Sequence, residues 1–314
     1  MSAIAIPYVA FDVSKRTLQF EGPCRQSTGK IPNQAAPLVR ELQRLRVLYP
    51  ALQLVCEPTG GCERLLVATA QALQLPLTLV DAWKVRHFAL GLGWLEKSDP
   101  IDAALLRRYA LTAAVAPTPP ADAHHARLRD WVQLREHYVE RLGQEATFRQ
   151  TLGHASFQAR VQEECDHLEA LIAELDAQIV AFLQTEAPEL NDKVQTLCLV
   201  TGVGLRSATA LLAHLPELGR YRDAAIAKLA GLAPIVDDSG QRTGNKHIAR
   251  GRANARRALY LAALVAAQHN EHLQPFYRRL RLAGKPAKVA LIAVARKLLV
   301  FLNSLLKPAP LQPS

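Results

Sequence analysis

The sequence predicts a chain in three parts: an α/β domain over residues 1–115, a hinge and long helical arm over residues 116–190, and a mostly α-helical domain over residues 191–314. Short apolar strands alternate with helices in the first part, which is typical of an α/β layer. Gly and Pro are then nearly absent over Ala123–Leu183. The charge is also uneven, because residues 241–314 carry a net charge of +13 and the whole chain +10.

Apolar runs and helical spacing define the elements of the first part. We expect strands at Tyr8–Val13, Thr17–Phe20, Leu52–Glu57 and Leu77–Asp81. We expect helices at Asn33–Leu48, Cys62–Leu73 and Pro100–Ala113. Together they predict a central mixed sheet flanked by helices.

A proline-rich segment, Ala116–Asp122, indicates a domain edge. Beyond it, Leu168, Ile172, Leu175 and Ile179 keep the spacing of one helix face. We therefore expect a long helical hairpin or coiled-coil arm. Packing and self-association explain such an arm equally well.

The last part of the chain is predicted to be helical around two glycine-containing segments. Val200–Leu212 is a Gly-rich turn that opens a helix, and Pro234–Gly251 is a Gly-rich basic loop. Two apolar helices are expected near Ala253–Gln268 and Ala287–Leu306.

Cysteine usage and hydropathy exclude several classes of protein. The five Cys residues show no CxxC or Cys/His ligand spacing, which argues against a structural zinc site and fits a reducing cytoplasm. We see no signal peptide, and the longest apolar stretch, Ala258–Gln268, is about half a bilayer span. A cytoplasmic protein without membrane contact is expected.

Four carboxylates form a candidate acidic site. Asp12 and Glu57 each end a predicted strand, and Asp99 and Asp102 begin a helix in the segment KSDPIDA. Strand ends form the ligand crevice of an open α/β sheet, and residues three apart on a helix share a face. Convergent carboxylates of this kind suit Mg²⁺, whose shell is completed by water and phosphate.

Local roles could also explain these acids. Asp99 before Pro100 has the signature of a helix N-cap, and Asp102 would then sit where the helix dipole favours an acid. Glu57 could be an ordinary turn residue before Pro58. Asp12 is harder to explain in this way, because an acid that closes an apolar strand is costly unless it is used.

The loop Pro234–Gly251 contains a second candidate site. Ser239 precedes Gly240 among cations that could stabilise a transferring phosphate, although Ser-Gly alone more often only makes a turn.

A Gly202-Val203-Gly204 turn could bind phosphate at a helix N-terminus, and close helix packing explains it equally well. The candidate nucleic-acid contacts are Lys15, Lys97, Gly202, Gly204, Arg242, Lys246, Arg250, Arg252, Arg256 and Arg257, with further basic residues over 278–297.

Several motifs together resemble one family. VAFDVSK, CEPTG and KSDPIDA, in that order and spacing, resemble the N-terminal motifs of the DEDD transposases of bacterial insertion sequences. The segments VTGVG, AGLAP, the Ser-Gly turn, IARGRANARRAL and AVARKLL resemble the family's second region. The resemblance extends from about residue 8 to residue 306.

The resemblance implies a fold and a mechanism. The N-terminal domain would be RNase H-like (RuvC-like), and Asp12, Glu57, Asp99 and Asp102 would match the Mg²⁺-binding acids. Ser239 would match a nucleophilic serine that links covalently to DNA. A homo-oligomer, dimer or tetramer, would act with a structured non-coding guide RNA.

The leading hypothesis is therefore a Mg²⁺-dependent site-specific DNA recombinase of an insertion sequence. Two alternatives stay open. In one, the acids form a RuvC-like metal-dependent junction endonuclease and Ser239 is inert. In the other, the chain is a non-catalytic nucleic-acid-binding protein with a degenerate site.

Overall fold

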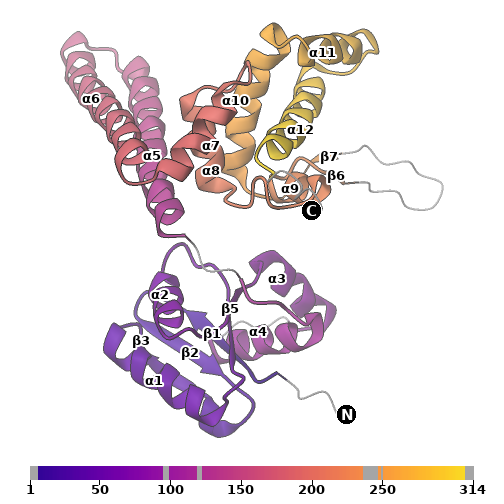
Figure 1. The fold of residues 1–314 in the computed structure, drawn as a ribbon. Coiled ribbons are helices and arrows are strands. Elements are labelled where there is room, and N and C mark those ends of the chain that lie inside the picture. Colours follow the sequence, from indigo (N-terminus) through magenta and orange to yellow (C-terminus); the bar gives the residue numbers. More distant parts are fainter. Residues whose placement is uncertain (1–5, 95–98, 119–121, 236–246, 249, 308–314) are drawn as a thin grey trace. The chain divides into compact units, whose positions relative to one another are not determined.

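The computed structural model describes residues 6–94, 99–118, 122–235, 247–248 and 250–307, and only the backbone at 99–101, 235 and 247. It divides into two compact units, residues 1–120 and 121–314. Each unit is described by itself (Figure 1). The division falls inside the proline-rich segment Ala116–Asp122.

The first unit is built on a five-stranded mixed sheet of order β3-β2-β1-β4-β5. Its strands are β1 (Tyr8–Val13), β2 (Thr17–Glu21), β3 (Gly29–Pro32), β4 (Gln53–Cys56) and β5 (Leu77–Leu79). β1 pairs antiparallel with β2 and parallel with β4, and β5 continues the parallel half. The structure confirms the expected mixed sheet and adds β3, which the sequence did not predict.

Helices cover both faces of this sheet. They are α1 (Ala35–Leu48), α2 (Arg64–Ala72), α3 (Ala82–Gly91) and α4 (Asp99–Ala113), and a short 3-10 turn η1 spans Arg25–Ser27. Strand alternation sends Val9 and Phe11 into the core with α1 and α2. Tyr8 and Ala10 point to the opposite face, into the core with α3 and α4.

The second unit begins with two long helices, α5 (Ala123–Thr151) and α6 (Ala155–Thr185). They pack against one another as an antiparallel pair. Ion pairs cross between them: Arg127–Glu186, Arg135–Asp176 and Arg141–Glu164. Because the partners of later α5 residues come earlier in α6, the pairs fix the antiparallel register of the arm.

The rest of the second unit is helical, as expected. It contains α7 (Pro188–Cys198), α8 (Leu205–His214), α9 (Asp223–Leu229), α10 (Ala253–His269), α11 (Leu273–Leu282) and α12 (Ala287–Leu305). Its core is rich in Ala and Leu and includes the base of the arm. Buried Asn303 joins α12 to the loop before α9, because it accepts from Gly219 N (2.8 Å) and donates to the Tyr221 carbonyl (3.0 Å).

Two short strands, β6 (Pro234–Ile235) and β7 (His247–Ile248), pair antiparallel. They flank residues 236–246, which lie outside the described part of the chain. No helix among the described residues is long and apolar enough to cross a bilayer.

Candidate active site

Asp12 and Glu57 lie at neighbouring strand ends of the first unit. In the parallel pairing of β1 with β4, Phe11 is opposite Cys56. Asp12 is the next residue after Phe11, and Glu57 is the next residue after Cys56. Neighbouring strands lie about 4.8 Å apart, so the two carboxylates occupy adjacent positions at one edge of the sheet. Both residues are half-buried.

The alternation of side chains along β1 places Asp12 on the face that carries Tyr8 and Ala10. That face is covered by α4, whose Leu105 and Leu106 belong to the same core. Asp12 therefore points to the side of the sheet on which α4 lies.

The direction of α4 brings its first turn to the acidic edge. The Arg107 side chain donates from Nε to the Tyr8 carbonyl (3.2 Å), and the Tyr8 hydroxyl donates to the Val115 carbonyl beyond the end of α4 (3.2 Å). The C-terminal half of α4 thus lies at the start of β1. Its N-terminal turn, with half-buried Asp102, runs toward the strand ends that carry Asp12 and Glu57.

These carboxylates supply the hard oxygen ligands that a divalent cation such as Mg²⁺ takes. The described side chains form no group of three or more metal-ligating residues. The Asp99 side chain lies outside the described residues, although its backbone begins α4. The donor types fit a divalent metal, and the structure brings Asp12 and Glu57 to neighbouring strand ends. It does not bring described Asp102 into one group of three with them, and Asp99 is the predicted member whose side-chain position is not described.

Glu63 organises the loop that follows Glu57, a role that the sequence analysis did not identify. Its carboxylate accepts from Gly61 N (2.9 Å), Thr59 N (3.0 Å) and the Thr59 hydroxyl (3.2 Å). Partial burial would raise the pKa of Glu63, but the hydrogen bonds from its own backbone, Thr59 and Gly61 outweigh it and lower that pKa. Glu63 follows the Gly60-Gly61 pair by two residues, which by itself does not indicate this role.

Asn33 connects the two loops of the acidic edge. Its Nδ2 donates to the Ser14 carbonyl after β1 (2.9 Å) and to the Cys62 carbonyl in the loop after β4 (3.1 Å). The segments that follow Asp12 and Glu57 are thereby held together by one side chain.

Cys56 lies beneath the acidic edge and is not a candidate ligand or nucleophile. Burial, and then the negative charges of Glu63 and Glu57, raise the pKa of its thiol to about 12. The side chain is fully buried, so it acts as a neutral apolar residue.

Asp81 also follows a strand at this edge, but its carboxylate has a local function. It accepts from Trp83 N (2.9 Å) and is the N-cap of α3. Asp81 and Asp12 therefore offer a matched pair of strand-end acids for mutagenesis.

Ser239 lies outside the described residues, but described segments on either side of residues 236–246 contact one another. Gly231 and Gly251 have φ of +67° and +70° and meet backbone to backbone. A Cβ on Gly251 would lie 2.2 Å from Gly231 N, and Arg252 N donates to the Leu229 carbonyl (2.8 Å). Gly231 of AGLAP and Gly251 of IARG, whose motifs flank the serine segment in the sequence, are thus in contact.

The predicted nucleic-acid contacts have different surroundings. Lys97, Arg242 and Lys246 lie outside the described residues, while Lys15, Arg250 and Arg257 are exposed. Two others also serve the fold. Arg252 pairs with Glu217 at 2.5 and 2.7 Å, and Arg256 donates to the Arg250 carbonyl (2.5 Å).

In the Gly202-Val203-Gly204 turn before α8, Gly202 packs closely against another helix, whereas Gly204 has free space around it. Gly202 has φ +105°, and a Cβ there would meet Ala266 of α10 at 2.7 Å. Close helix packing therefore accounts for Gly202. Gly204, the N-cap of α8, has nothing within 4 Å of a Cβ built on it, which leaves this helix start open.

Comparison with known proteins covers both units. Residues 9–155 match the DEDD transposase family of the IS110 type, described as "Transposase", and residues 194–278 match the "Transposase IS116/IS110/IS902 family".

Individual relatives agree with these matches. The "Pilin gene-inverting protein" of Moraxella bovis is 28% identical over 252 residues, 79% of this chain and 78% of the relative. The "Insertion element IS110 uncharacterized 43.6 kDa protein" of Streptomyces coelicolor is 33% identical over 135 residues, 42% of this chain and 32% of the relative. The chain belongs to the IS110-type DEDD transposases, enzymes that catalyse DNA transposition and whose acidic signature implies a divalent metal.

Proposed function

We propose that this transposase is a site-specific recombinase that cuts and exchanges DNA strands through a covalent serine–DNA intermediate. Asp12, Glu57, Asp99 and Asp102 hold Mg²⁺, and Ser239 is the nucleophile. The observation that carries the proposal is the parallel register of β1 and β4, which brings Asp12 and Glu57 to adjacent positions. The relative described as a gene-inverting protein supports recombination over simple cleavage, because inversion requires cut strands to be rejoined.

In this mechanism the chain's own residues position and transfer one phosphoryl group. The Ser239 oxygen attacks the scissile phosphorus, the P–O3′ bond breaks, and a 3′-hydroxyl leaves while the 5′-phosphate stays on the serine. A 3′-hydroxyl from the exchanged strand then attacks the phosphoserine and releases Ser239. Bound Mg²⁺ supplies charge stabilisation at the phosphate oxygens. Arg250 and Arg257 contribute positive charge near the loop.

The proposal includes two macromolecular partners besides the DNA. A structured guide RNA sets the target by base pairing, as in other RNA-guided systems. The α5–α6 arm serves self-association as a coiled coil in a dimer or tetramer. Exposed Phe148 and Phe157, on either side of the turn between its helices, support such contacts.

The test uses DNA with a nick next to the insertion site, incubated with Mg²⁺ and the guide RNA, and analyses denatured protein for a covalent DNA adduct. Wild type is expected to form the adduct, and Ser239→Ala is expected to lose it. Ser304→Ala, an exposed serine on α12, is the control and should keep it. Cleavage without any adduct would instead support the metal-dependent endonuclease.

The proposed metal-binding role of the acids is tested by the same substitution at Asp12 and at Asp81, which both lie at strand ends of the sheet. Asp12→Asn should abolish cleavage, because a neutral amide no longer balances the charge of a divalent cation. Asp81→Asn should keep it, because Asn caps a helix about as well as Asp. Equal activity of wild type and Asp12→Asn would contradict the proposed site.

A further inference from the structure

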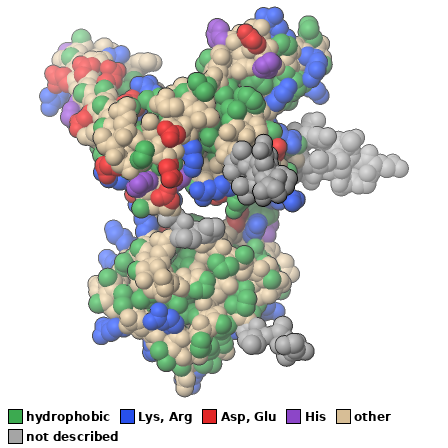
Figure 2. Space-filling model, in the orientation of Figure 1, with side chains coloured by type: hydrophobic (Ala, Val, Ile, Leu, Met, Phe, Trp, Pro, Cys, Tyr) green, Lys and Arg blue, Asp and Glu red, His purple; other side chains and the backbone are tan. Residues whose placement is uncertain are grey.

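The hairpin of α11 and α12 has a uniformly basic surface. Residues 272–307 contain no Asp or Glu. The Lys and Arg side chains of the hairpin are all exposed: Arg278, Arg279, Arg281, Lys285, Lys288, Arg296 and Lys297. Lys307, beyond the end of α12, pairs with Asp223 at 2.9 Å. Figure 2 shows Lys and Arg side chains along the outer edge of this hairpin. Cations without interspersed acids are the electrostatic footprint of a polyanion-binding surface.

Phe276 brings cations from both helices together. The Arg279 guanidinium lies 5.4 Å from the centre of its ring, and the Lys297 ammonium lies 4.8 Å from it. The ring attracts each cation, but two like charges over one ring repel one another. Phe276 thus gathers one cation from each helix at one point of the surface, which concentrates the positive charge that a phosphate would meet.

Leu282 projects from the middle of the basic surface. It is 89% exposed, the highest value among the large apolar side chains of the described residues. It lies one helical turn after Arg278 on the same helix face, and Lys285 follows three residues later in the turn. A single exposed Leu is ordinary on a protein surface, whereas one surrounded by cations combines an apolar tip with phosphate-binding groups.

The turn that presents Leu282 is firmly hydrogen-bonded. Ala283 N donates to the Arg279 carbonyl, Gly284 N to the Arg281 carbonyl and Lys285 N to the Leu280 carbonyl, each at 3.0 to 3.1 Å. Gly284 has φ +75°, which a helix end of this kind requires. The backbone that carries Leu282 is therefore held in place before any ligand binds.

We propose that the α11–α12 hairpin is a duplex-DNA clamp in which its cations bind phosphates on both sides of a groove and Leu282 inserts against a base step. Apolar wedges of this kind enter the minor groove between base pairs, partly unstack them and bend the duplex. DNA is the occupant because the family's reaction is transposition. The inference rests on the proposed function for its substrate, and it assigns a binding surface and a wedge that the acidic site does not contain.

Charge neutralisation tests the clamp. The full chain is titrated in EDTA against a short fluorescein-labelled DNA duplex of arbitrary sequence, with anisotropy read at several salt concentrations. The variant Arg278→Gln/Arg281→Gln/Lys285→Gln should bind more weakly, with the slope of log K against log salt reduced by about 0.9 for each phosphate that the protein no longer neutralises.

The control variant, Arg40→Gln/Arg149→Gln/Lys193→Gln, removes three positive charges outside the α11–α12 hairpin. Its slope of log K against log salt should equal that of wild type. Circular dichroism checks that each variant is folded. A wild-type slope in the α11–α12 variant would overturn the proposal. Loss of binding to an RNA duplex with DNA binding unchanged would also overturn it and assign the surface to RNA.

The wedge is tested by the fluorescence of 2-aminopurine in the duplex, which rises when the base is unstacked. Wild type should raise it, and Leu282→Gln should lose the rise while keeping the salt slope, because no cation is removed. Leu199→Gln is the matched control, since Leu199 is 85% exposed on the same unit. An unchanged rise in Leu282→Gln would contradict insertion.

Failure of this inference is separable from failure of the proposed function. Asp12→Asn, tested without metal, should bind and unstack DNA like wild type even though it does not cleave. Normal cleavage by Asp12→Asn would refute the acidic site alone, whereas normal binding by the α11–α12 variant would refute the clamp alone.

Discussion

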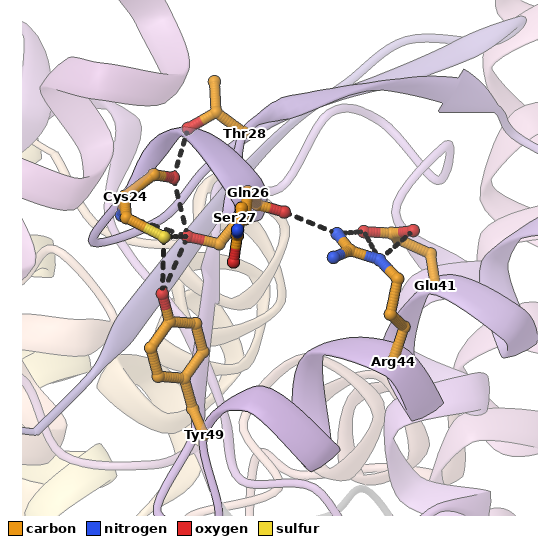
Figure 3. Close-up of polar contacts among 7 residues, drawn as sticks. All are labelled: Cys24, Gln26, Ser27, Thr28, Glu41, Arg44 and Tyr49. Carbon is orange, nitrogen blue, oxygen red and sulfur yellow. Dashed lines mark hydrogen bonds and ion pairs between the residues drawn. The ribbon is translucent and has the colours of Figure 1, made fainter.

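At the scale of single residues, hydrogen bonding separates a reactive cysteine from an inert one. Cys24 is exposed, its Sγ lies 3.2 Å from the Tyr49 hydroxyl, and it contacts Ser27 at 3.7 Å (Figure 3). The hydrogen bond with Tyr49, and then that with Ser27, lower the pKa of the Cys24 thiol to about 7. Cys56, by contrast, is buried and neutral.

Alkylation of Cys24 by iodoacetamide should therefore rise with a midpoint near pH 7, since the thiolate is the nucleophile. Tyr49→Phe removes the first of these hydrogen bonds and should move the midpoint to higher pH. Peptide mass spectrometry measures the labelling rate of each cysteine, with Cys56 as the unreactive internal control. A midpoint that does not move in Tyr49→Phe would contradict the assignment.

Glu63 makes the loop that follows Glu57 sensitive to acid. Its pKa is lowered in the folded chain, so its stabilising contribution is present above the ordinary pKa of Glu, about 4.3, and is lost as the pH falls through the lower folded value. Glu63→Gln should reduce the free energy of unfolding at neutral pH, and its difference from wild type should shrink below about pH 4.3.

Urea unfolding at neutral and acidic pH measures this difference. Glu169→Gln, an exposed acid on α6, is the control and should differ little from wild type at either pH. A Glu63→Gln deficit that stays constant as the pH falls would show that the carboxylate charge is not its cause.

At the scale of elements, the paired motifs below the serine segment depend on two glycines. Gly251→Ala places a side chain at φ +70° and against the Gly231 backbone. The left-handed conformation alone costs roughly 1–2 kcal/mol, and the steric overlap adds to it. We expect a lower free energy of unfolding and weaker recombination, measured by urea denaturation and the adduct assay.

Gly143→Ala is the matched control, because Gly143 lies inside α5 with nothing within 4 Å of a Cβ. Ala is favoured over Gly in a helix interior by roughly 0.5–1 kcal/mol, so this variant should be more stable than wild type. Equal behaviour of the two variants would show that the close approach of Gly231 and Gly251 has no structural role.

The elements that the sequence predicted are those with strong apolar patterns. β1 was expected at Tyr8–Val13 and is found there, because its residues are buried on both faces and read as one apolar run. β3, with the sequence GKIP, was missed: it is an edge strand with one large apolar side chain, and it is specified by pairing with β2. α11 carries few buried residues and one large basic face, so apolar spacing did not reveal it.

The candidate site likewise has one part that the sequence predicted and another that it did not. The rule that strand ends form the ligand crevice predicted the adjacency of Asp12 and Glu57, which depends only on strand order. Glu63 and Asn33 could not be predicted, because their function is to hold backbone groups whose positions arise from turns far apart in the sequence.

At the scale of the whole molecule, the two units have separate cores. The clusters on the two faces of the sheet lie within residues 1–120, and the helical core lies within residues 121–314. Among the described residues, no side chain is a member of more than one of these three clusters. Each unit can therefore unfold as its own cooperative step, and ligands that bind one unit stabilise that unit.

Scanning calorimetry of the full chain should accordingly show two transitions, and Mg²⁺ should raise the temperature of one. A ligand at a hundred times its Kd adds about 2.7 kcal/mol to the stability of the unit that binds it. Asp12→Asn or Asp102→Asn should remove the Mg²⁺ shift, whereas Asp81→Asn should keep it because its carboxylate caps α3. A shift that persists in Asp12→Asn would place the metal elsewhere, and this readout needs neither guide RNA nor DNA.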